Sequence, residues 1–243
     1  MRIVTWNCCR GPFDRKMAAL DGLRPDIAII PEAMAPEAQT DCLRWFPSNA
    51  SRLGIQVRAF NGYRLARVRK ASAELPNCVS PVLVTHGESG AQFSLLAVWT
   101  WPAPSYSRAF LNGLAAYARL LKRGPAVVAG DFNGSPFFDR PTARVKRWGL
   151  GFDQLHAAGL VSAYHRHHDV AYGGEAHATH HFLRKPERPF HIDFCFVPRT
   201  WAEQGLAVQL VNDEPWRRLS DHFPLVVDVG PPAQQGGRAE VAQ

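Results

Sequence analysis

Short apolar runs rich in β-branched residues recur along almost the whole chain, and they constrain its fold more than any other feature. Each run is four to eight residues long, a length typical of strands and too short for most helices. Several runs are apolar at every position, which indicates strands covered on both faces. The runs lie at residues 3–6, 27–30, 79–85, 93–100, 126–129, 192–197, 206–211 and 225–229. We therefore expect at least one many-stranded sheet.

Helical patterns are fewer and lie between these runs. The clearest covers residues 107–123, where apolar residues follow the 3.6-residue period until Gly124-Pro125 ends the helix. Asp14 is placed to cap a shorter helix, and a third helix is expected over residues 152–158. Helices interspersed with strands predict a mixed α/β fold.

The chain is basic, and the basic residues are clustered. It has 28 Lys and Arg against 21 Asp and Glu, a formal charge of +7. Residues 42–73 contain seven basic residues and no acidic one, and a second cluster covers residues 140–147. Asn61-Gly62 inside the first cluster is a hairpin signal, so we expect a basic β-ribbon there. The charge fits a phosphate-rich partner and also an ordinary solvated face, and it does not separate the two.

The cysteines and the chain ends bear on compartment and domain organisation. Five cysteines without a C-x-x-C pair argue against a disulfide framework and a cysteine-rich zinc module, so we expect a cytoplasmic protein. A strand pattern directly at the N-terminus leaves no room for a signal peptide, and no apolar run approaches the ~20 residues of a membrane span. We expect a monomer with one domain over residues 1–229 and a disordered tail over residues 230–243.

Polar side chains stand where the predicted strands end. They are Asn7, Glu32, Asp131, Asn133 and the pair Asp221-His222. A further acid, Asp193, lies within an apolar strand, where a carboxylate needs a partner or a metal. Each residue alone is as readily a turn, cap or solvated residue, but groups at strand ends of α/β sheets converge on one crevice. Oxygen ligands of this kind suit Mg²⁺ or Mn²⁺.

Five motifs containing these residues stand in the order and approximate spacing of a known family. They are Trp6-Asn7, Pro31-Glu32, Gly130-Asp131-Phe132-Asn133, His191-Ile192-Asp193-Phe194 and Ser220-Asp221-His222. From residue 1 to about residue 229 the chain resembles the endonuclease/exonuclease/phosphatase superfamily. The resemblance implies a four-layer α/β sandwich, with two mixed β-sheets packed face to face and helices outside. It also implies Mg²⁺-dependent cleavage of phosphate esters.

The resemblance implies roles for three residues around the metal. Glu32 would be the main ligand, and Asn7 would lie beside it and orient metal-bound water or phosphate. Asp221 would support this ion or a second metal position. The Mg²⁺ or Mn²⁺ ion would act as Lewis acid and template.

The resemblance assigns the catalytic steps to four more residues. Asp131 would orient or deprotonate the attacking water, and Asn133 would hold that water or a phosphate oxygen. Asp193 would align His222, and His222 would stabilise the pentacovalent phosphate or relay a proton.

One stretch departs from the family pattern. After the strand over residues 93–100 the family often has a His or Tyr that contacts the scissile phosphate, whereas this chain has Thr100-Trp101-Pro102. Trp101 is a candidate to stack on a substrate base, with core or rim packing as the more common use of such a residue. The family's proton donor therefore has no obvious counterpart.

Seven of the ten histidines lie between residues 165 and 191. Their spacing matches no metal-ligand motif, so we favour an exposed loop over a second metal site. Within this stretch His180, His181 and Arg184 are candidates to line the cleft and contact substrate phosphate.

Three functions stay open at this point. The leading hypothesis is a metal-dependent phosphodiesterase, a nuclease acting on DNA or RNA. The second keeps the chemistry but takes a small phosphate ester, such as an inositol phosphate or a phospholipid head group. The third is a non-catalytic scaffold or nucleic-acid-binding module, motivated by the missing His or Tyr.

Overall fold

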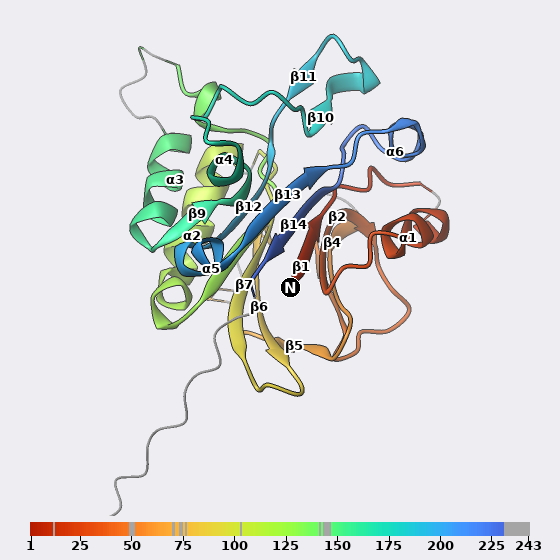
Figure 1. The fold of residues 1–243 in the computed structure, drawn as a ribbon, viewed down its shortest axis with the longest axis vertical. Helices are drawn as coiled ribbons and strands as arrows, with labels where there is room; N and C mark the ends of the chain where they lie inside the picture. Colours follow the sequence, from red (N-terminus) through yellow and green to blue (C-terminus); the bar gives the residue numbers. More distant parts are fainter. Residues whose placement is uncertain are drawn as a thin grey trace, which may run out of the picture.

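All eight apolar runs form strands, which assemble with four further strands into two mixed sheets of six strands each. The structure is a computed structural model and describes residues 1–11, 13–48, 52–69, 71–72, 75, 77–102, 104–140, 142 and 147–230. The sheets pack face to face between two groups of helices (Figure 1). The predicted α/β class and four-layer sandwich are confirmed.

The first and the last strand of the chain lie side by side inside the first sheet. Its order is β13 (Leu206–Leu210), β14 (Leu225–Val229), β1 (Arg2–Thr5), β2 (Ile27–Met34), β4 (Leu53–Ala59) and β3 (Leu43–Pro47). β1 is parallel to β2 and antiparallel to β14.

The second sheet contains the other long apolar runs. Its order is β5 (Tyr63–Arg67), β6 (Val79–His86), β7 (Gln92–Trp99), β8 (Ala126–Asp131), β12 (Asp193–Pro198) and β9 (Leu160–Ser162). Only β7 and β8 are parallel among the pairs of this sheet. A separate short ribbon pairs β10 (His180–His181) with β11 (Pro189–Phe190).

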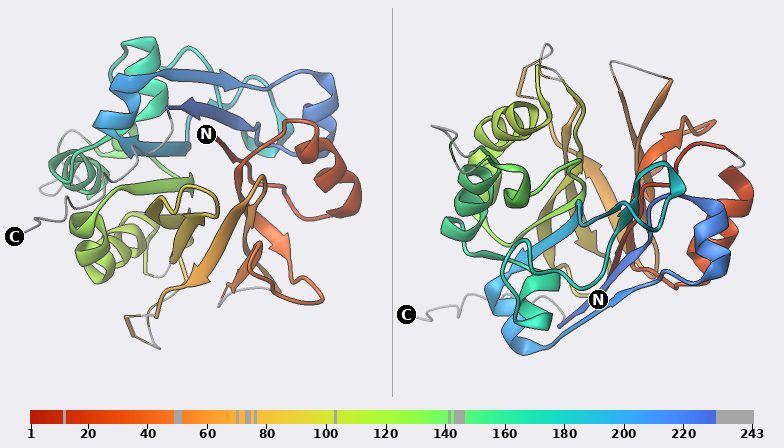
Figure 2. Two further views of the ribbon diagram at one scale, coloured as in Figure 1. Left: turned by 60° about the horizontal axis from the view of Figure 1, so that its bottom comes forward. Right: turned by 90° about the horizontal axis from the view of Figure 1, so that it is seen from above.

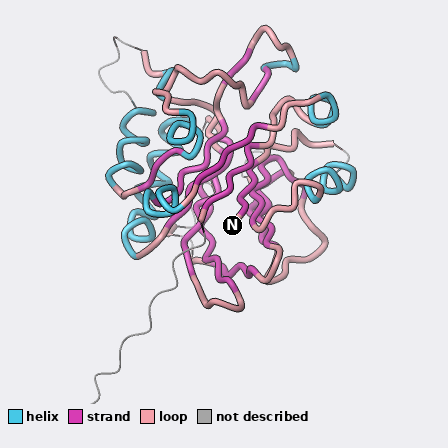
Figure 3. Tube along the Cα trace, viewed as in Figure 1, coloured by secondary structure: helices cyan, strands magenta, loops and turns pink. Residues whose placement is uncertain are grey.

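The helices lie on the outer faces of the sheets or at the edge of the core between them, where Tyr164 of one helix and Trp201 of another are buried. They are α1 (Phe13–Asp21), α2 (Tyr106–Arg123), α3 (Arg147–Ala157), α4 (Ala163–His168), α5 (Arg199–Gln204) and α6 (Glu214–Leu219), with 3-10 turns at Pro136–Phe138 and Phe182–Arg184. Figure 2 shows α2 and α3 on one flank and α1 and α6 on the other. Figure 3 shows the same division, with strands inside and helices outside.

Strands buried on both faces explain the continuous apolar runs. Successive side chains of a strand point to opposite faces, so Ile3 packs between the two sheets and Val4 packs against α1. In the same way Cys195 faces the inner core, whereas Phe194 packs with the side chains of α2 and α3.

The prediction of a basic β-ribbon is wrong, although the turn inside it exists. Asn61 and Gly62 both have positive φ values, 50° and 81°, as a two-residue hairpin turn requires. β4 pairs with β2 and β3 on its two sides, however, so it has no free edge for β5, which pairs with β6. The turn therefore leads from one sheet to the other and divides the basic residues between them.

The three predicted helices are present with shifted ends. α2 begins after Ser105, whose hydroxyl accepts a hydrogen bond from the Arg108 amide. Asp14 lies in the first turn of α1 instead of capping it, where its charge faces the positive helix end. α3 begins five residues earlier than the predicted residue 152.

Other expectations are tested only in part. No helix in the described ranges is long and apolar enough to cross a membrane. All five cysteines are free thiols. The predicted tail lies outside the described residues except for Gly230, whose amide donates to the Gly205 carbonyl.

Candidate active site

The polar residues named from the sequence meet at one end of the crevice between the sheets. Asn7 follows β1 and Glu32 lies in β2 of the first sheet, whereas Asp131 ends β8 and Asp193 begins β12 of the second. Asp131 and Asp193 stand opposite each other in the β8–β12 ladder. Both sheets thus contribute side chains to one site.

Asn7 connects the two sheets at this point. Its Nδ2 donates hydrogen bonds to Glu32 Oε1 at 3.2 Å and to Asp131 Oδ2 at 2.9 Å. Its Oδ1 accepts one from the Cys9 amide at 2.9 Å, which fixes the orientation of the side chain. Asn7 is 1% exposed, so these bonds are made away from bulk water.

A β-bulge turns the Glu32 side chain toward the crevice. The sequence pattern predicts that the strand ends at residue 30, but β2 continues to Met34 with a register shift between Ile30 and Ala33. Pro31 has no amide hydrogen to donate to the ladder, and Glu32 follows it with φ 57°. A positive φ at a non-glycine residue is uncommon and persists where the surroundings enforce it. The Glu32 side chain is 21% exposed, compared with 1% for Asp131, and its Oε2 lies 3.5 Å from Arg10 Nε.

Asp131 is enclosed by amide donors. Asn133 donates to it through its backbone amide at 2.8 Å and through Nδ2 at 3.0 Å, in addition to the bond from Asn7. Asn133 has φ 53°, a conformation that asparagine tolerates, and its Nδ2 also donates to the Thr100 carbonyl at 3.0 Å. Burial raises the pKa of Asp131, with the charge of His222 acting in the opposite direction.

His222 and Asp193 form a buried pair. Nδ1 of His222 donates to Asp193 Oδ2 at 2.9 Å, which leaves Nε2 facing Asp131 Oδ2 at 3.9 Å. The other carboxylate oxygen, Asp193 Oδ1, is buried without a hydrogen-bond partner in the part of the chain that the structure describes. Burial lowers the pKa of His222, but the charges of Asp193 and Asp131 outweigh it and raise that pKa. The ring is therefore protonated on both nitrogens, and positively charged, at neutral pH.

A second imidazole lies beside the first. His180 and His222 form an isolated antiparallel β-bridge, and their ring centroids are 4.2 Å apart. His180 Nε2 lies 3.8 Å from Asp221 Oδ2. Burial raises the pKa of Asp221, but the polar contact with His180 and the charge of His222 outweigh burial and lower that pKa. The structure thus brings His180 and Asp221 to the site.

Two of the remaining candidates lie at the edge of the site. Arg184 is exposed, donates to the Arg217 carbonyl at 3.0 Å and has Nη2 3.9 Å from the Cys9 sulfur. His181 packs its ring edge-on against Phe223 at 4.8 Å.

Trp101 packs rather than projecting freely. It is half-buried against the core between the sheets, and its ring lies edge-on to that of Trp99 at 5.5 Å. The Thr100 hydroxyl donates to the Phe132 carbonyl. Neither side chain supplies the His or Tyr that the family often has here.

The prediction of an exposed histidine loop is wrong for three of its seven members. His167, His168 and His177 are exposed and His181 is half-buried, whereas His165, His180 and His191 are each at most 9% exposed. The reason is local pairing: His165 bonds to Ser162 Oγ at 2.8 Å and to Glu175 Oε1 at 3.0 Å. Burial raises the pKa of Glu175, but the hydrogen bonds from His165 and from backbone amides outweigh it and lower that pKa to about 2.

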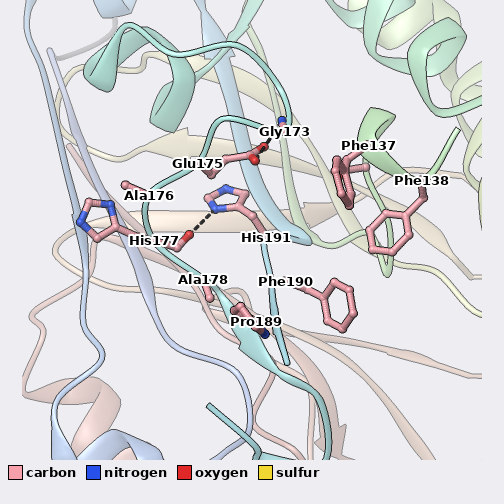
Figure 4. A pocket seen from close by; sticks show the side chains of 11 residues that line it. Phe137, Phe138, Gly173, Glu175, Ala176, His177, Ala178, Pro189, Phe190 and His191 are labelled. Atoms are coloured by element: carbon pink, nitrogen blue, oxygen red, sulfur yellow. Dashed lines mark hydrogen bonds between the residues drawn. The ribbon is translucent and has the colours of Figure 1, made fainter. Parts of the chain in front are cut away.

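A cavity of about 240 Å³ lies beside the site, next to His177 and His191. Figure 4 shows the rings of Phe137, Phe138 and Phe190 on one wall and Glu175 and His191 on the other. His191 donates from Nδ1 to the His177 carbonyl at 2.9 Å, drawn as a dashed line in Figure 4. The cavity borders the site because His191 and Asp193 are next but one in sequence.

The donor set fits a hard divalent cation. Glu32 offers an accessible carboxylate, and Asn7 links it to the Asp131 carboxylate through its Nδ2, while the Asn7 Oδ1 accepts from the Cys9 amide. Such oxygen donors suit Mg²⁺ or Mn²⁺. Among the described residues, His180, Asp221 and His222 also place three ligand-type atoms within 4.8 Å of one another, a mixed nitrogen and oxygen set. Asp131, Asp193 and His222 do the same but already bond or face one another.

Sequence reasoning missed Lys16, which supports the loop after β1. Lys16 is 3% exposed and its ammonium donates to the carbonyls of Cys8, Cys9 and Arg10. These bonds hold the loop that begins at Asn7. The one available signal was a lysine beside Met17 on the apolar side of the predicted helix.

Comparisons with known proteins find likeness in structure alone. No family model matches the chain, and no curated protein matches it in sequence. The AP endonuclease LMAP from Leishmania major superimposes with a TM-score of 0.67 at 15% identity, covering 95% of this chain and 88% of that one. A 3'-5' exonuclease (NExo) from Neisseria meningitidis gives 0.63 at 17% identity, covering 94% and 99%. An endonuclease/exonuclease/phosphatase from Beutenbergia cavernae gives 0.61 at 18%, covering 94% and 71%.

Proposed function

We propose that this chain, which has the fold of the endonuclease/exonuclease/phosphatase superfamily, is a metal-dependent phosphodiester hydrolase that acts on nucleic acid. One observation carries the proposal: Asn7 and Glu32 of one sheet meet Asp131 of the other, and Asp131 faces the buried His222–Asp193 pair. A buried acid and a buried imidazolium at one crevice have little structural purpose, because burying charge costs free energy.

Glu32 and Asn7 would hold the Mg²⁺ or Mn²⁺ ion, with Asp221 supporting it from the other side of the site. When bound, the ion supplies Lewis acidity and neutralises charge that develops on the phosphate oxygens. The β-bulge at Glu32 supports this assignment, since it presents a strand carboxylate to the crevice at the cost of a positive φ.

Asp131 would orient and deprotonate the attacking water. Its raised pKa makes it a stronger base than an exposed aspartate, and its remaining contacts fix its direction. Asn133 would hold that water through its Oδ1, because both hydrogens of its Nδ2 already donate, to Asp131 and to the Thr100 carbonyl. A bond to a phosphate oxygen would replace one of these two.

His222 would stabilise the pentacovalent phosphate. Asp193 fixes the ring so that Nε2 points toward Asp131 and the crevice, and the raised pKa keeps the ring protonated at neutral pH. A positive donor held in place would strengthen as negative charge grows on the phosphate oxygens.

The net charge of +7 is compatible with nucleic acid as the substrate. One similar solved structure is titled a 3' phosphatase NExo bound to product DNA hairpin, with a TM-score of 0.62 at 19% identity. Hydrolysis of small phosphate esters would use the same chemistry, so the test must distinguish these substrates from nucleic acid.

The test incubates the purified chain with single- and double-stranded DNA, abasic DNA, RNA and a panel of small phosphate esters. Each substrate is tried with Mg²⁺, with Mn²⁺ and with a chelator. We expect polymer cleavage that needs the ion and falls by about 10²- to 10⁴-fold in Asp131→Ala and His222→Ala.

A matched control is His167→Ala, which removes an exposed histidine outside the site. It should cleave like the parent. Cleavage of small esters only would overturn the nucleic-acid assignment, and equal activity of the parent and both site variants would overturn the catalytic one.

A further inference from the structure

A second hollow, about 480 Å³ in volume, lies between the far edges of the two sheets. It is lined by Trp45 and Phe46 of β3, Arg67 at the end of β5, Arg69 and Asn77 after it, and Tyr117 of α2. This set combines aromatic rings with two arginines, and none of its lining residues is acidic. We call it the arginine hollow.

The first sheet connects the arginine hollow to the candidate active site. The indole Nε1 of Trp45 donates to the Ala33 carbonyl at 3.4 Å, and Ala33 is the residue after Glu32. Trp45 therefore stands directly beside the bulge that presents the Glu32 carboxylate.

The second sheet sets the distance between the arginines and the candidate active site. Trp99 stands opposite Asp131 in the β7–β8 pair, and Val79, at the start of β6, stands opposite Val98. Arg67 stands opposite Val82, four strands along from β12 and three from β8. The residues in line with Arg67 on the next strands are Val82, Leu95 and Val127, and Val127 lies four residues before Asp131. Three strand spacings of about 4.8 Å and four residues of about 3.3 Å therefore put Arg67 about 20 Å from Asp131.

The two arginines are available to a ligand. Arg67 and Arg69 are exposed, and within the described ranges neither guanidinium has an ion-pair or hydrogen-bond partner. Guanidinium groups bind phosphate oxygens in a bidentate fashion. The hollow thus offers two unpaired positive charges close to rings.

The aromatic wall is fixed before any ligand binds. The Trp45 ring lies over Gly54, where a Cβ atom would come within 2.6 Å of the indole nitrogen. This packing and the bond to Ala33 leave the ring little freedom, so stacking against it costs little conformational entropy.

We infer that the arginine hollow binds one nucleotide of a single-stranded nucleic acid, with its base against Trp45 and its phosphate between Arg67 and Arg69. This inference rests on the proposed function and narrows its substrate to a strand that reaches from the active site to the hollow. Stacking on fixed rings combined with backbone phosphate contacts is how proteins bind unpaired strands, because the bases of a duplex are already stacked.

The binding test uses fluorescence anisotropy with fluorescein-labelled 12-residue oligothymidylate and oligoadenylate RNA, in EDTA to prevent cleavage. Trp45→Ala should weaken binding about tenfold, as loss of one stacked base does. Arg67→Ala/Arg69→Ala should weaken it similarly and reduce the slope of log K against log salt by about 0.7, since the pair neutralises one phosphate of a single strand.

The control is Arg123→Ala/Arg199→Ala, which removes the same charge from two exposed positions that do not line the hollow, before β8 begins and after β12 ends. It should bind within about twofold of the parent. Hollow variants that bind like this control, or that lose as much affinity for a 12-base-pair duplex as for a single strand, would overturn the inference.

A cleavage assay separates this inference from the proposed function. The ratio of kcat/KM for the 12-residue strand to that for a dinucleotide should fall about tenfold in Arg67→Ala/Arg69→Ala and stay constant in the control pair. If the parent cleaves neither substrate, the proposed function fails, and the anisotropy comparison by itself then decides whether the hollow binds a strand.

Discussion

Replacing Asp193 with Asn tests the buried His–Asp pair most directly, because it keeps the side-chain shape and removes the charge. The His222 Nδ1 to Asp193 Oδ2 distance is 2.9 Å, and both side chains are at most 6% exposed. With charge centres about 4 Å apart and an effective dielectric constant of about 20, the attraction is about 4 kcal/mol. This corresponds to about 3 pKa units, so the pKa of His222 should fall by that order in Asp193→Asn.

The lower pKa of His222 in Asp193→Asn should reduce activity at high pH more than at low pH. In the parent the raised pKa of His222 keeps the ring charged throughout the neutral range. In Asp193→Asn the ring loses its proton as the pH rises through that range, and we expect kcat to fall with it. A fall of about 3 units from a pKa of about 10 leaves about a tenth of the rings protonated at pH 8, so the deficit should be about tenfold there and about 10²-fold at pH 9.

The assay is steady-state kcat on a cleavable oligonucleotide with Mg²⁺ at pH values from 5.5 to about 9, a range chosen to bracket free histidine. Asp169→Asn, an exposed aspartate, is the matched control. Thermal unfolding checks that each variant is folded at the assay temperature. A parental kcat and pH profile in Asp193→Asn would refute the idea that His222 acts through this carboxylate.

Three further predictions concern stability. Gly130→Ala should lower the free energy of unfolding by about 3–5 kcal/mol in urea titrations, because Gly130 has φ 145° and a Cβ there would lie 1.9 Å from the Val98 carbonyl oxygen; an unchanged midpoint contradicts this. Lys16→Met should cost about 1–3 kcal/mol by leaving the loop carbonyls unpaired, and a raised melting temperature would contradict it. Glu175→Gln should be about 3 kcal/mol less stable than the parent at pH 7, and the gap should close as the pH falls from about 4.5 toward 2, where the parent's Glu175 takes up a proton; a constant gap would count against the pairing with His165.

The long strands could be predicted because they are buried on both faces and therefore apolar throughout. The short or half-buried strands could not: β3 is half-buried with no apolar alternation, and β9 and β10 have three and two residues. Strand pairing was also out of reach at Asn61-Gly62, since β4 already has two partners and only the assembled sheet reveals this.

The meeting of the polar residues could be anticipated from their position at strand ends. The sequence could not give the bulge at Glu32, the support from Lys16 or the position of Trp45 beside Ala33, because each depends on contacts between distant segments. The burial of His180 has the same origin, since it follows from the bridge to His222. The roles assigned to these side chains stay predictions until variants are assayed.

The hydrogen bond of 2.9 Å between Asn7 and Asp131 spans the two halves of the sandwich. Widening the gap between the halves by less than 1 Å would break this bond, since hydrogen bonds weaken beyond about 3.2 Å. Residues of the core between the sheets, such as Cys195 and Val197, set the distance between the two sheets. A larger side chain at either position would push the sheets apart and separate Asn7 from Asp131 while the chain stays folded. Catalytic activity should then be lost at a lower temperature than the one at which the chain unfolds.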